Sequence, residues 1–262
     1  MNPEGNDVMF CMKARLVPTS ALTFRILPGS IVHIATYPFV PPTTLSGYLR
    51  RLDSLSKGTL PPTTAGHSGK KAPPYWVLPP EFICCGAYPE WGEWTVHRTA
   101  RLGPESLSHT LAGRLRSEKD KQNPQLHTWE YLVVTELTAY VVHEDADALK
   151  SLAKTVNNVG CKLGKEGFAY VAKTSVVKLE RAHTRAVPST IAPAKDLLDS
   201  PADVYPLYAY DWDRKKTFDF ESPSPVNGFR PFTAGWTDGG VKTDYWSGDG
   251  VNIPASLLEV LA

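Results

Sequence analysis

The sequence has no hydrophobic run long enough to cross a bilayer, which takes roughly 20 apolar residues. Residues 1–10 have neither the basic end nor the apolar stretch of a secretion signal. The four cysteines, Cys11, Cys84, Cys85 and Cys161, form no C-x-x-C pair and have no histidine partner at zinc-finger spacing. We therefore expect a cytoplasmic protein without membrane contacts, whose reduced cysteines mostly pack in its interior.

Common catalytic signatures are also missing. No H-E-x-x-H or G-x-S-x-G motif occurs, and no pair of carboxylates stands out. The glycine-rich segment 160–167 is not a Walker loop, because Gly164-Lys165 is followed by Glu166 and leads into a predicted strand. We expect neither a metal nor a cofactor.

Charge is unevenly distributed along a chain whose net charge is only +1. Residues 1–198 carry 23 Lys and Arg against 17 Asp and Glu, whereas residues 199–262 carry 5 against 10. The densest basic stretches are 150–185, with eight basic and two acidic residues, and 96–128, with six and three. Locally basic surface attracts phosphate, although each stretch could also be a solvated face.

Hydrophobic periodicity predicts a strand at the start of the chain. Residues 8–17 alternate, with apolar side chains on one side and Lys13 and Arg15 on the other. A helix follows Pro41-Pro42, with a threonine as its cap, because Leu45, Tyr48, Leu49 and Leu52 recur at helical spacing. Arg50 and Arg51 lie off that apolar stripe.

The later segments complete an α+β pattern. Short strands are expected at 75–78, 81–85 and 94–100, a long central strand at 129–142, a helix over 149–156 and a strand at 168–179. The order of strands and helices predicts an antiparallel ferredoxin-like (RRM-like) domain over residues 1–198. Residues 96–128 would project from it as a basic insertion.

The C-terminal part, residues 199–262, is β-rich. We expect a hairpin of 204–212 with 217–221 and a short helix at 254–261. This part either completes the sheet or forms a small β subdomain.

Two segments resemble a known family. Tyr37-Pro38-Phe39-Val40-Pro41-Pro42-Thr43-Thr44-Leu45-Ser46-Gly47-Tyr48-Leu49 resembles the proline-threonine-glycine signature that opens the first helix of CRISPR-associated proteins of the fifth Cas family, in the RAMP superfamily. Residues 159–168 resemble the later glycine loop of that family, which enters the last core strand. The two motifs cover some 25 residues, but their order and separation cover most of the first 180.

The resemblance implies a non-catalytic subunit of a type I CRISPR surveillance complex (Cascade) in antiviral defence. Such a subunit holds the 5′ handle of the guide RNA (crRNA) and caps the backbone filament. Its partners are the crRNA, the backbone subunit and the large subunit, with target DNA reached indirectly through the complex. A projecting thumb contacts the neighbouring backbone subunit and the RNA.

Carried over to this sequence, the glycine loop and its lysines would cradle handle phosphates, the first-helix motif would lie nearby, and the insertion would take the thumb's place. The predicted RNA-binding residues are Lys13, Arg15, Thr43, Thr44, Gly47, Arg50, Arg98, Arg101, Arg114, Arg116, Lys119, Lys121, Gly160, Lys162, Gly164, Lys165 and Gly167.

Three alternatives stay open. The glycines could serve only the geometry of a helix-to-strand turn. The protein could be a metal-independent endoribonuclease that processes precursor crRNA, with His33 or His97 and a nearby Lys or Tyr. It could also be an equivalent subunit of another CRISPR effector type, or an unrelated ferredoxin-like RNA binder.

Overall fold

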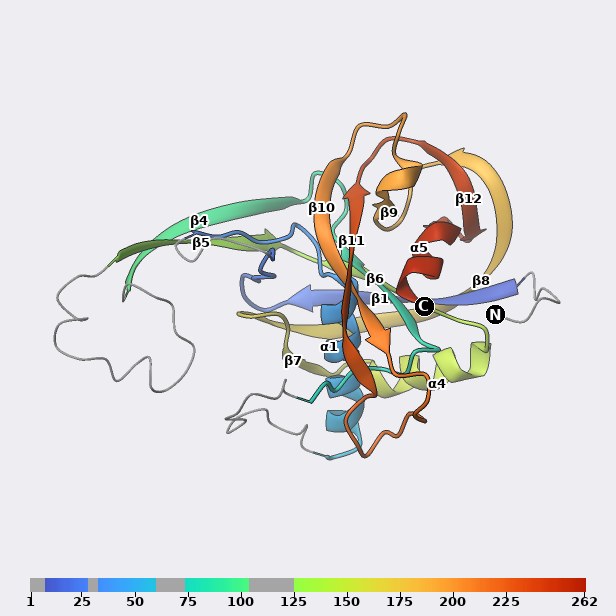
Figure 1. The fold of residues 1–262 in the computed structure, drawn as a ribbon. Coiled ribbons are helices and arrows are strands. Elements are labelled where there is room, and N and C mark those ends of the chain that lie inside the picture. Colours follow the sequence, from blue (N-terminus) through green and yellow to red (C-terminus); the bar gives the residue numbers. More distant parts are fainter. Residues whose placement is uncertain (1–7, 28–32, 60–73, 104–124) are drawn as a thin grey trace.

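The computed structural model describes residues 8–27, 33–59, 74–103 and 125–262. Among these residues the main sheet has seven strands, and its central part follows the chain order β1 (Val8–Pro18), α1 (Pro42–Ser56), β3 (Ile83–Tyr88), β6 (Leu137–His143), α4 (Ala146–Val156) and β8 (Phe168–Ala186), with α1 and α4 packed against the strands. These strands lie in the order β8-β1-β6-β3, and every pair is antiparallel. Two split βαβ units are thereby interleaved, which confirms the predicted α+β, ferredoxin-like fold (Figure 1).

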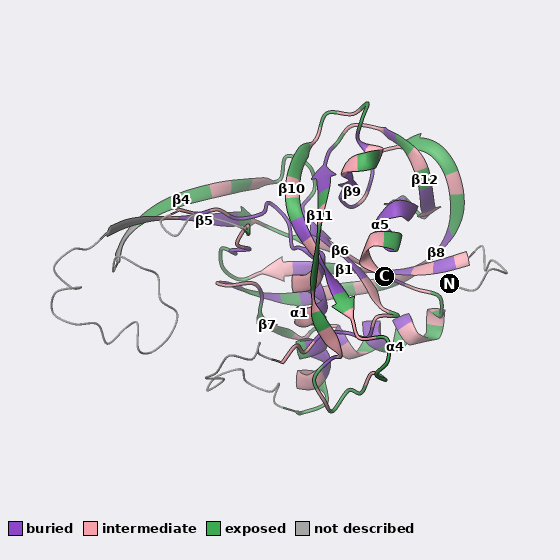
Figure 2. Cartoon of the chain, in the orientation of Figure 1, coloured by how far each residue is buried: buried purple, intermediate pink, exposed green. Residues whose placement is uncertain are grey.

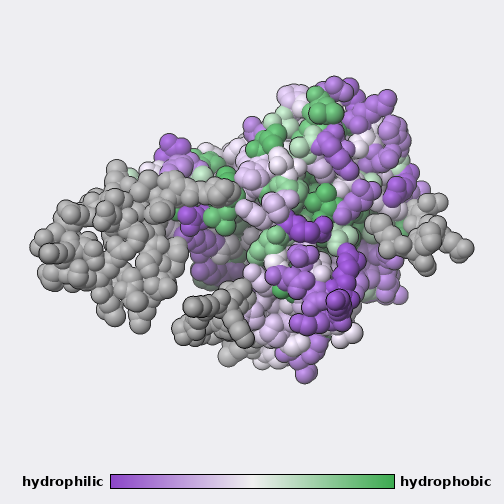
Figure 3. Space-filling model, in the orientation of Figure 1, coloured by the Kyte–Doolittle hydropathy of each residue, from purple (hydrophilic) through white to green (hydrophobic). Residues whose placement is uncertain are grey.

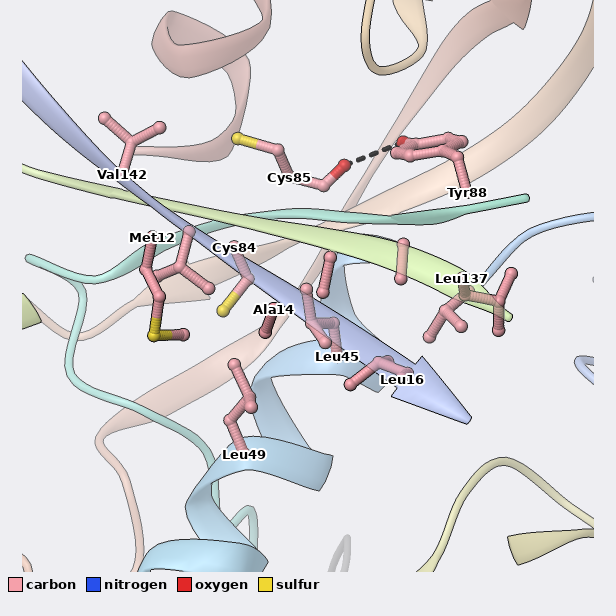
Figure 4. Close-up of a cluster of buried hydrophobic side chains, with 14 of the residues drawn as sticks. Met12, Ala14, Leu16, Leu45, Leu49, Cys84, Cys85, Tyr88, Leu137 and Val142 are labelled. Carbon is pink, nitrogen blue, oxygen red and sulfur yellow. Dashed lines mark hydrogen bonds between the residues drawn. The ribbon is translucent and has the colours of Figure 1, made fainter. Parts of the chain in front are cut away.

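The face of this sheet that is covered by α1 and α4 carries one part of the core. Met12, Ala14 and Leu16 of β1 are buried, and Figure 4 shows them on the side of Leu45 and Leu49 of α1. Because successive side chains of a strand point to opposite faces, the residues between them face away from the helices. The predicted alternation of β1 is therefore confirmed.

Helix α1 departs from the sequence prediction at two points. Pro41 is the N-cap and no side chain caps the helix, so neither threonine does so; proline suits a helix start because its φ is fixed and it needs no N–H partner. Arg50 is only 3% exposed. It donates to the Phe220 carbonyl and lies over the Phe220 ring, 4.2 Å from the centroid. Arg50 does lie off the apolar stripe, as predicted, but a C-terminal segment covers that side of the helix and buries it.

A two-stranded ribbon projects from the main sheet (Figure 1). It pairs β4 (Trp94–Gly103) with β5 (Gln125–Val134), and the short β2 (His33–Ile34) joins β5 in parallel. Figure 2 shows that most of β4 is exposed. The ribbon occupies the place of the predicted insertion. The prediction of one continuous strand at 129–142 is wrong. The strand is interrupted at residues 135–136, and the segments before and after this point belong to two different sheets.

The C-terminal part contributes to two sheets. Strand β10 (Asp203–Trp212) pairs with β11 (Val226–Trp236), which also pairs with β9 (Ala192–Pro193). Residues 217–221 form no strand, so the predicted hairpin partner is wrong, as is the strand expected at 75–78. Strands β12 (Val241–Gly248) and β13 (Val251–Pro254) extend the main sheet beyond β8.

The C-terminal residues share the hydrophobic core of the first part of the chain. Helix α5 (Ala255–Leu261) confirms the predicted terminal helix and follows β13 directly. A single 3-10 turn, Ala194–Asp196, follows β9. Trp236, Ile253 and Leu257 belong to the same buried cluster as Met12 and Leu49. Residues 199–262 therefore complete the main sheet and add a second one over a common core.

The cysteines pack as predicted. None forms a disulfide; Cys11, Cys84 and Cys85 are buried and Cys161 is half-buried. Burial raises the pKa of the Cys11 and Cys84 thiols to about 12 and that of Cys161 to about 11. Since the thiolate is the reactive form, these side chains act as small apolar groups. Within the described ranges, no helix combines the length and apolarity that a membrane span requires.

Candidate nucleic-acid interface

A cleft of about 340 Å³ opens where three segments meet. These are the first half of α1, the segment 23–25 and the hairpin that joins β7 (Gly160–Lys162) to β8. The residues that line the cleft are Thr23, Phe24, Arg25, Pro41, Thr44, Gly47, Tyr48, Arg51, Lys162, Gly164 and Lys165.

Two glycines let segment 21–24 lie directly against the β7–β8 hairpin. Gly164 has φ +75° and Gly167 has φ +116°, and a Cβ on Gly164 would come within 2.7 Å of the Thr23 carbonyl oxygen. The Lys165 N–H donates to that oxygen (2.9 Å), and the Thr23 N–H donates to the Glu166 carbonyl (3.0 Å). The close approach therefore explains why these positions are glycine.

The hairpin is less open to an anion through its backbone than the sequence suggested. The amides of Leu163 and Lys165 are both used inside the protein, by the carbonyls of Gly167 and Thr23. Gly160 lies in strand β7 opposite Tyr170, outside the turn. Side chains, rather than a row of glycine amides, thus give the cleft its attraction for an anion.

The cleft is strongly basic. Arg25, Arg51, Lys162 and Lys165 line it, and none of the described residues in its lining is acidic. Arg51 and Lys162 are exposed, whereas Arg25 and Lys165 are half-buried. Burial lowers the pKa of Lys165, and the positive charge of Arg25 lowers this pKa further. An anion in the cleft would relieve this crowding of like charges.

Lys165 connects the cleft to the projecting ribbon. Its Nζ lies 4.3 Å from the centre of the Trp129 ring on β5, in cation–π geometry. Next to it, Tyr131 of β5 donates from its hydroxyl to Glu166 Oε2 at 3.0 Å. Segment 21–24 lies between these elements, because Leu22 pairs with Leu132 of β5. The back of the cleft is therefore braced by the base of the ribbon.

Five residues predicted from the two motifs meet in this cleft: Thr44, Gly47, Lys162, Gly164 and Lys165. The prediction missed two cations. Arg51 could have been found, because Thr44, Gly47, Tyr48 and Arg51 follow helical spacing and share one stripe of α1. Arg25 has no comparable local signal, since its segment is placed by pairing with distant strands.

The remaining predicted residues lie elsewhere. Lys13 and Arg15 are on the sheet face opposite α1 and α4, where they pair with Asp249 (3.7 Å) and Glu136 (3.5 Å). Gly167 is buried in the turn. The Thr43 carbonyl accepts a hydrogen bond from Tyr210, and the Thr43 side chain does not line the cleft. Their role in RNA binding stays a prediction.

On the ribbon, Arg98 pairs with Glu130 at 2.9 Å. Only the backbone of Arg101, in β4, is described. The other predicted thumb residues, Arg114, Arg116, Lys119 and Lys121, lie outside the described residues.

The two histidines considered for catalysis lie on different strands of the ribbon sheet. His33 Nε2 is 3.4 Å from Glu130 Oε1, and His97 is exposed on β4. Strand β5 separates their strands. His33 pairs with Thr128 and His97 with Tyr131, three residues further along β5, so the two side chains lie on opposite faces of the ribbon sheet. Over the described part of the chain, no three His, Cys, Asp or Glu side chains are arranged to hold a metal ion.

Comparison with known proteins gives structural neighbours only. No protein-family model and no curated protein matches the sequence. Two chains from cryo-EM structures of the Type III-B Cmr-beta bound to cognate target RNA, the second also with AMPPnP, are similar at 12% identity and a TM-score of 0.39. The first match covers 64% of this chain and 60% of the other, and the second covers 88% and 86%. Similarity this low says nothing about function.

Proposed function

We propose that the chain is an RNA-binding subunit of a CRISPR effector complex. More specifically, it would be the non-catalytic subunit of a type I complex that holds the 5′ handle of the guide RNA in the basic cleft and caps the backbone filament. One observation carries the proposal. Gly47 and Lys162, from the two motifs that resemble the family, are 162 − 47 = 115 residues apart in sequence and line the same cleft.

The chemistry of the cleft suits a single-stranded RNA backbone. Arg51 and Lys162 are exposed cations at its surface, and Arg25 and Lys165 lie deeper. Single strands are held by cations on phosphates and by aromatic side chains on which bases stack. Phe168 pairs opposite Lys162 and is 55% exposed, which offers such a surface at the end of the hairpin.

The identity of the bound RNA tests the function directly. We would purify the tagged full-length chain from cells that carry its own CRISPR locus and sequence the RNA that co-purifies. We expect short RNAs that share one repeat-derived 5′ end, together with a repeating backbone protein and a large subunit. Co-purifying RNA without repeat sequence would refute the proposal.

Substitution of the two exposed cations tests the cleft. The probe is a fluorescein-labelled random-sequence RNA of about ten nucleotides, followed by anisotropy. Arg51→Ala with Lys162→Ala should weaken binding about tenfold and reduce the slope of log K against log salt by about 1.4, or 0.7 per lost phosphate contact. Arg185→Ala with Lys242→Ala is the matched control, since these two exposed cations are cross-strand neighbours on β8 and β12. Equal losses in both double variants would remove the cleft from the binding site.

The endoribonuclease alternative makes a different prediction. Repeat-containing RNA incubated with the protein in EDTA should stay intact on a denaturing gel if the chain only binds. A single cut that disappears in His33→Ala or His97→Ala would instead establish the nuclease. The separation of the two histidines by β5 supports binding without cleavage.

A further inference from the structure

A second cavity, of about 300 Å³, lies at the base of the projecting ribbon. It forms where the β3–β4 connection meets the end of β11 and residues 187–189. Trp236 is its central ring. The centroid of Trp91 lies 4.7 Å from that ring and the centroid of Tyr88 lies 6.1 Å from it. We call this cavity the aromatic pocket.

The aromatic pocket is ringed by negative charge. Glu90, Glu136 and Asp238 line it, and all three are exposed. Arg15 lies 3.5 Å from Glu136 and balances one of these charges. The lining itself contains no Lys or Arg among the described residues.

We propose that the aromatic pocket binds an arginine side chain presented by a protein partner. Trp91 is 44% exposed and offers an electron-rich ring to a cation, while the buried Trp236 ring packs behind it. A flat guanidinium can stack on such a ring while it donates to a carboxylate. Glu90 and Asp238 supply the complementary charge. The same carboxylates would repel phosphate, so the lining disfavours RNA. This inference does not depend on the proposed role of the basic cleft.

The exposure of Trp91 makes the site testable without disturbing the core. Trp91 is 44% exposed, although its ring packs against Trp236. Each of the seven tryptophans gives one indole N–H signal in a ¹H–¹⁵N spectrum of the full-length protein. The Trp91 signal is assigned from its loss in Trp91→Ala, and the same spectrum shows whether that variant folds.

The probe is the capped peptide acetyl-Gly-Arg-Gly-amide, titrated into the labelled protein. We expect saturable, millimolar shifts of the Trp91 and Trp236 signals, and no saturation with the peptide that has Gln in place of Arg. Glu90→Gln with Asp238→Asn should weaken binding about fivefold, because the carboxylates that face the arginine lose their charge. Glu144→Gln with Asp199→Asn removes the same charge from exposed positions elsewhere and should have no effect.

Three results would overturn the inference. These are equal shifts with the Gln peptide, unchanged affinity in the folded Trp91→Ala variant, or displacement of the same two signals by the random-sequence RNA. The last result would assign the aromatic pocket to nucleic acid.

Discussion

The basic cleft and the aromatic pocket are nearly equal in volume but opposite in chemistry. The cleft, about 340 Å³, has four cations beside α1; the aromatic pocket, about 300 Å³, has three carboxylates around tilted aromatic rings. They also lie on opposite faces of the main sheet. Tyr88 of the aromatic pocket pairs with Thr138, and Thr138 pairs with Arg15, which points away from α1 and α4. The size of a cavity thus says little about its ligand, and the charge of the lining residues decides which kind it attracts.

The two cavities are also built differently. Most of the cleft rests on one helix stripe and one hairpin, each readable as a motif, and segment 23–25 supplies the rest. The aromatic pocket gathers side chains from four separate connections between strands, including the turn before β12. Figure 3 shows that the apolar surface on the face in view is broken into separate patches. The predictions below test how far the cleft depends on its own residues, from the largest effect to the smallest.

Two neighbouring arginines, one buried and one exposed in the cleft, should respond differently to substitution. Arg50→Ala should destabilise the fold by about 3 kcal/mol, because the Phe220 carbonyl loses its donor and the Phe220 ring is uncovered. Asp53 loses its buried partner but keeps Lys57, whose Nζ lies 2.8 Å from Asp53 Oδ2. Arg51→Ala should change the unfolding free energy by less than about 0.5 kcal/mol and weaken RNA binding instead. Urea denaturation measures stability and anisotropy measures RNA binding. A comparable loss of stability in both variants would contradict the assignment of Arg50 to the fold and Arg51 to the cleft.

The hairpin glycine gives the next largest effect. Gly164→Ala should cost about 2–3 kcal/mol, since a Cβ there meets the Thr23 carbonyl and the Phe24 ring in addition to the strain of positive φ. Gly58→Ala is the control, because Gly58 has φ +71° with open space around it and should cost only about 1–2 kcal/mol. Urea unfolding of both variants measures the difference. Equal costs would mean that segment 21–24 does not press on the hairpin.

Charge reversal compares the two cavities directly. Lys162→Glu should weaken binding of the random-sequence RNA about tenfold, whereas Asp238→Lys in the aromatic pocket should leave it unchanged or slightly tighter. The two changes have equal size and opposite sign, and both positions are exposed. If Asp238→Lys strengthened binding as much as Lys162→Glu weakened it, only net charge would matter and the cleft would have no special role.

The pH dependence of Lys165 gives the smallest effect. Burial lowers its folded-state pKa below the ordinary 10.5, so the unfolded chain binds the proton more tightly. Stability should therefore rise as pH increases from the lowered pKa toward 10.5, and RNA affinity should fall over the same range. Urea midpoints and anisotropy across this range, with Lys165→Met and Lys165→Arg beside the native protein, provide the measurement. A native pH profile that matches that of Lys165→Met would show that Lys165 does not titrate as described.

Hydrophobic periodicity predicted which face of each strand or helix is buried. The alternation of β1 and the stripes of α1 and α4 follow from burial of one face, and they are present in the structure. The partner of β10 could not be predicted in the same way. A nearest-neighbour hairpin favours 217–221, but that segment instead carries Phe218 and Phe220 to Arg50, and the chain returns as β11 only at Val226.

The same limit applies to the two cavities. The glycine and helix motifs predicted five lining residues of the cleft, because residues close together in sequence determine the conformation of a helix and of a hairpin turn. Glu90, Glu136 and Asp238 of the aromatic pocket lie in three different connections between strands and meet only after those strands have paired, so no spacing among them marks the site.

Strand β8 has a consequence for how the whole protein responds to heat. Its first residues pair with β7 beside the cleft, its middle pairs with β1, and its last residues pair with β12. One continuous strand therefore pairs with β1 of the first part of the chain and with β12 of the C-terminal part. Neither part can unfold without removing hydrogen-bond partners from the other. Despite its polarised charge, the chain should lose its structure in a single cooperative step.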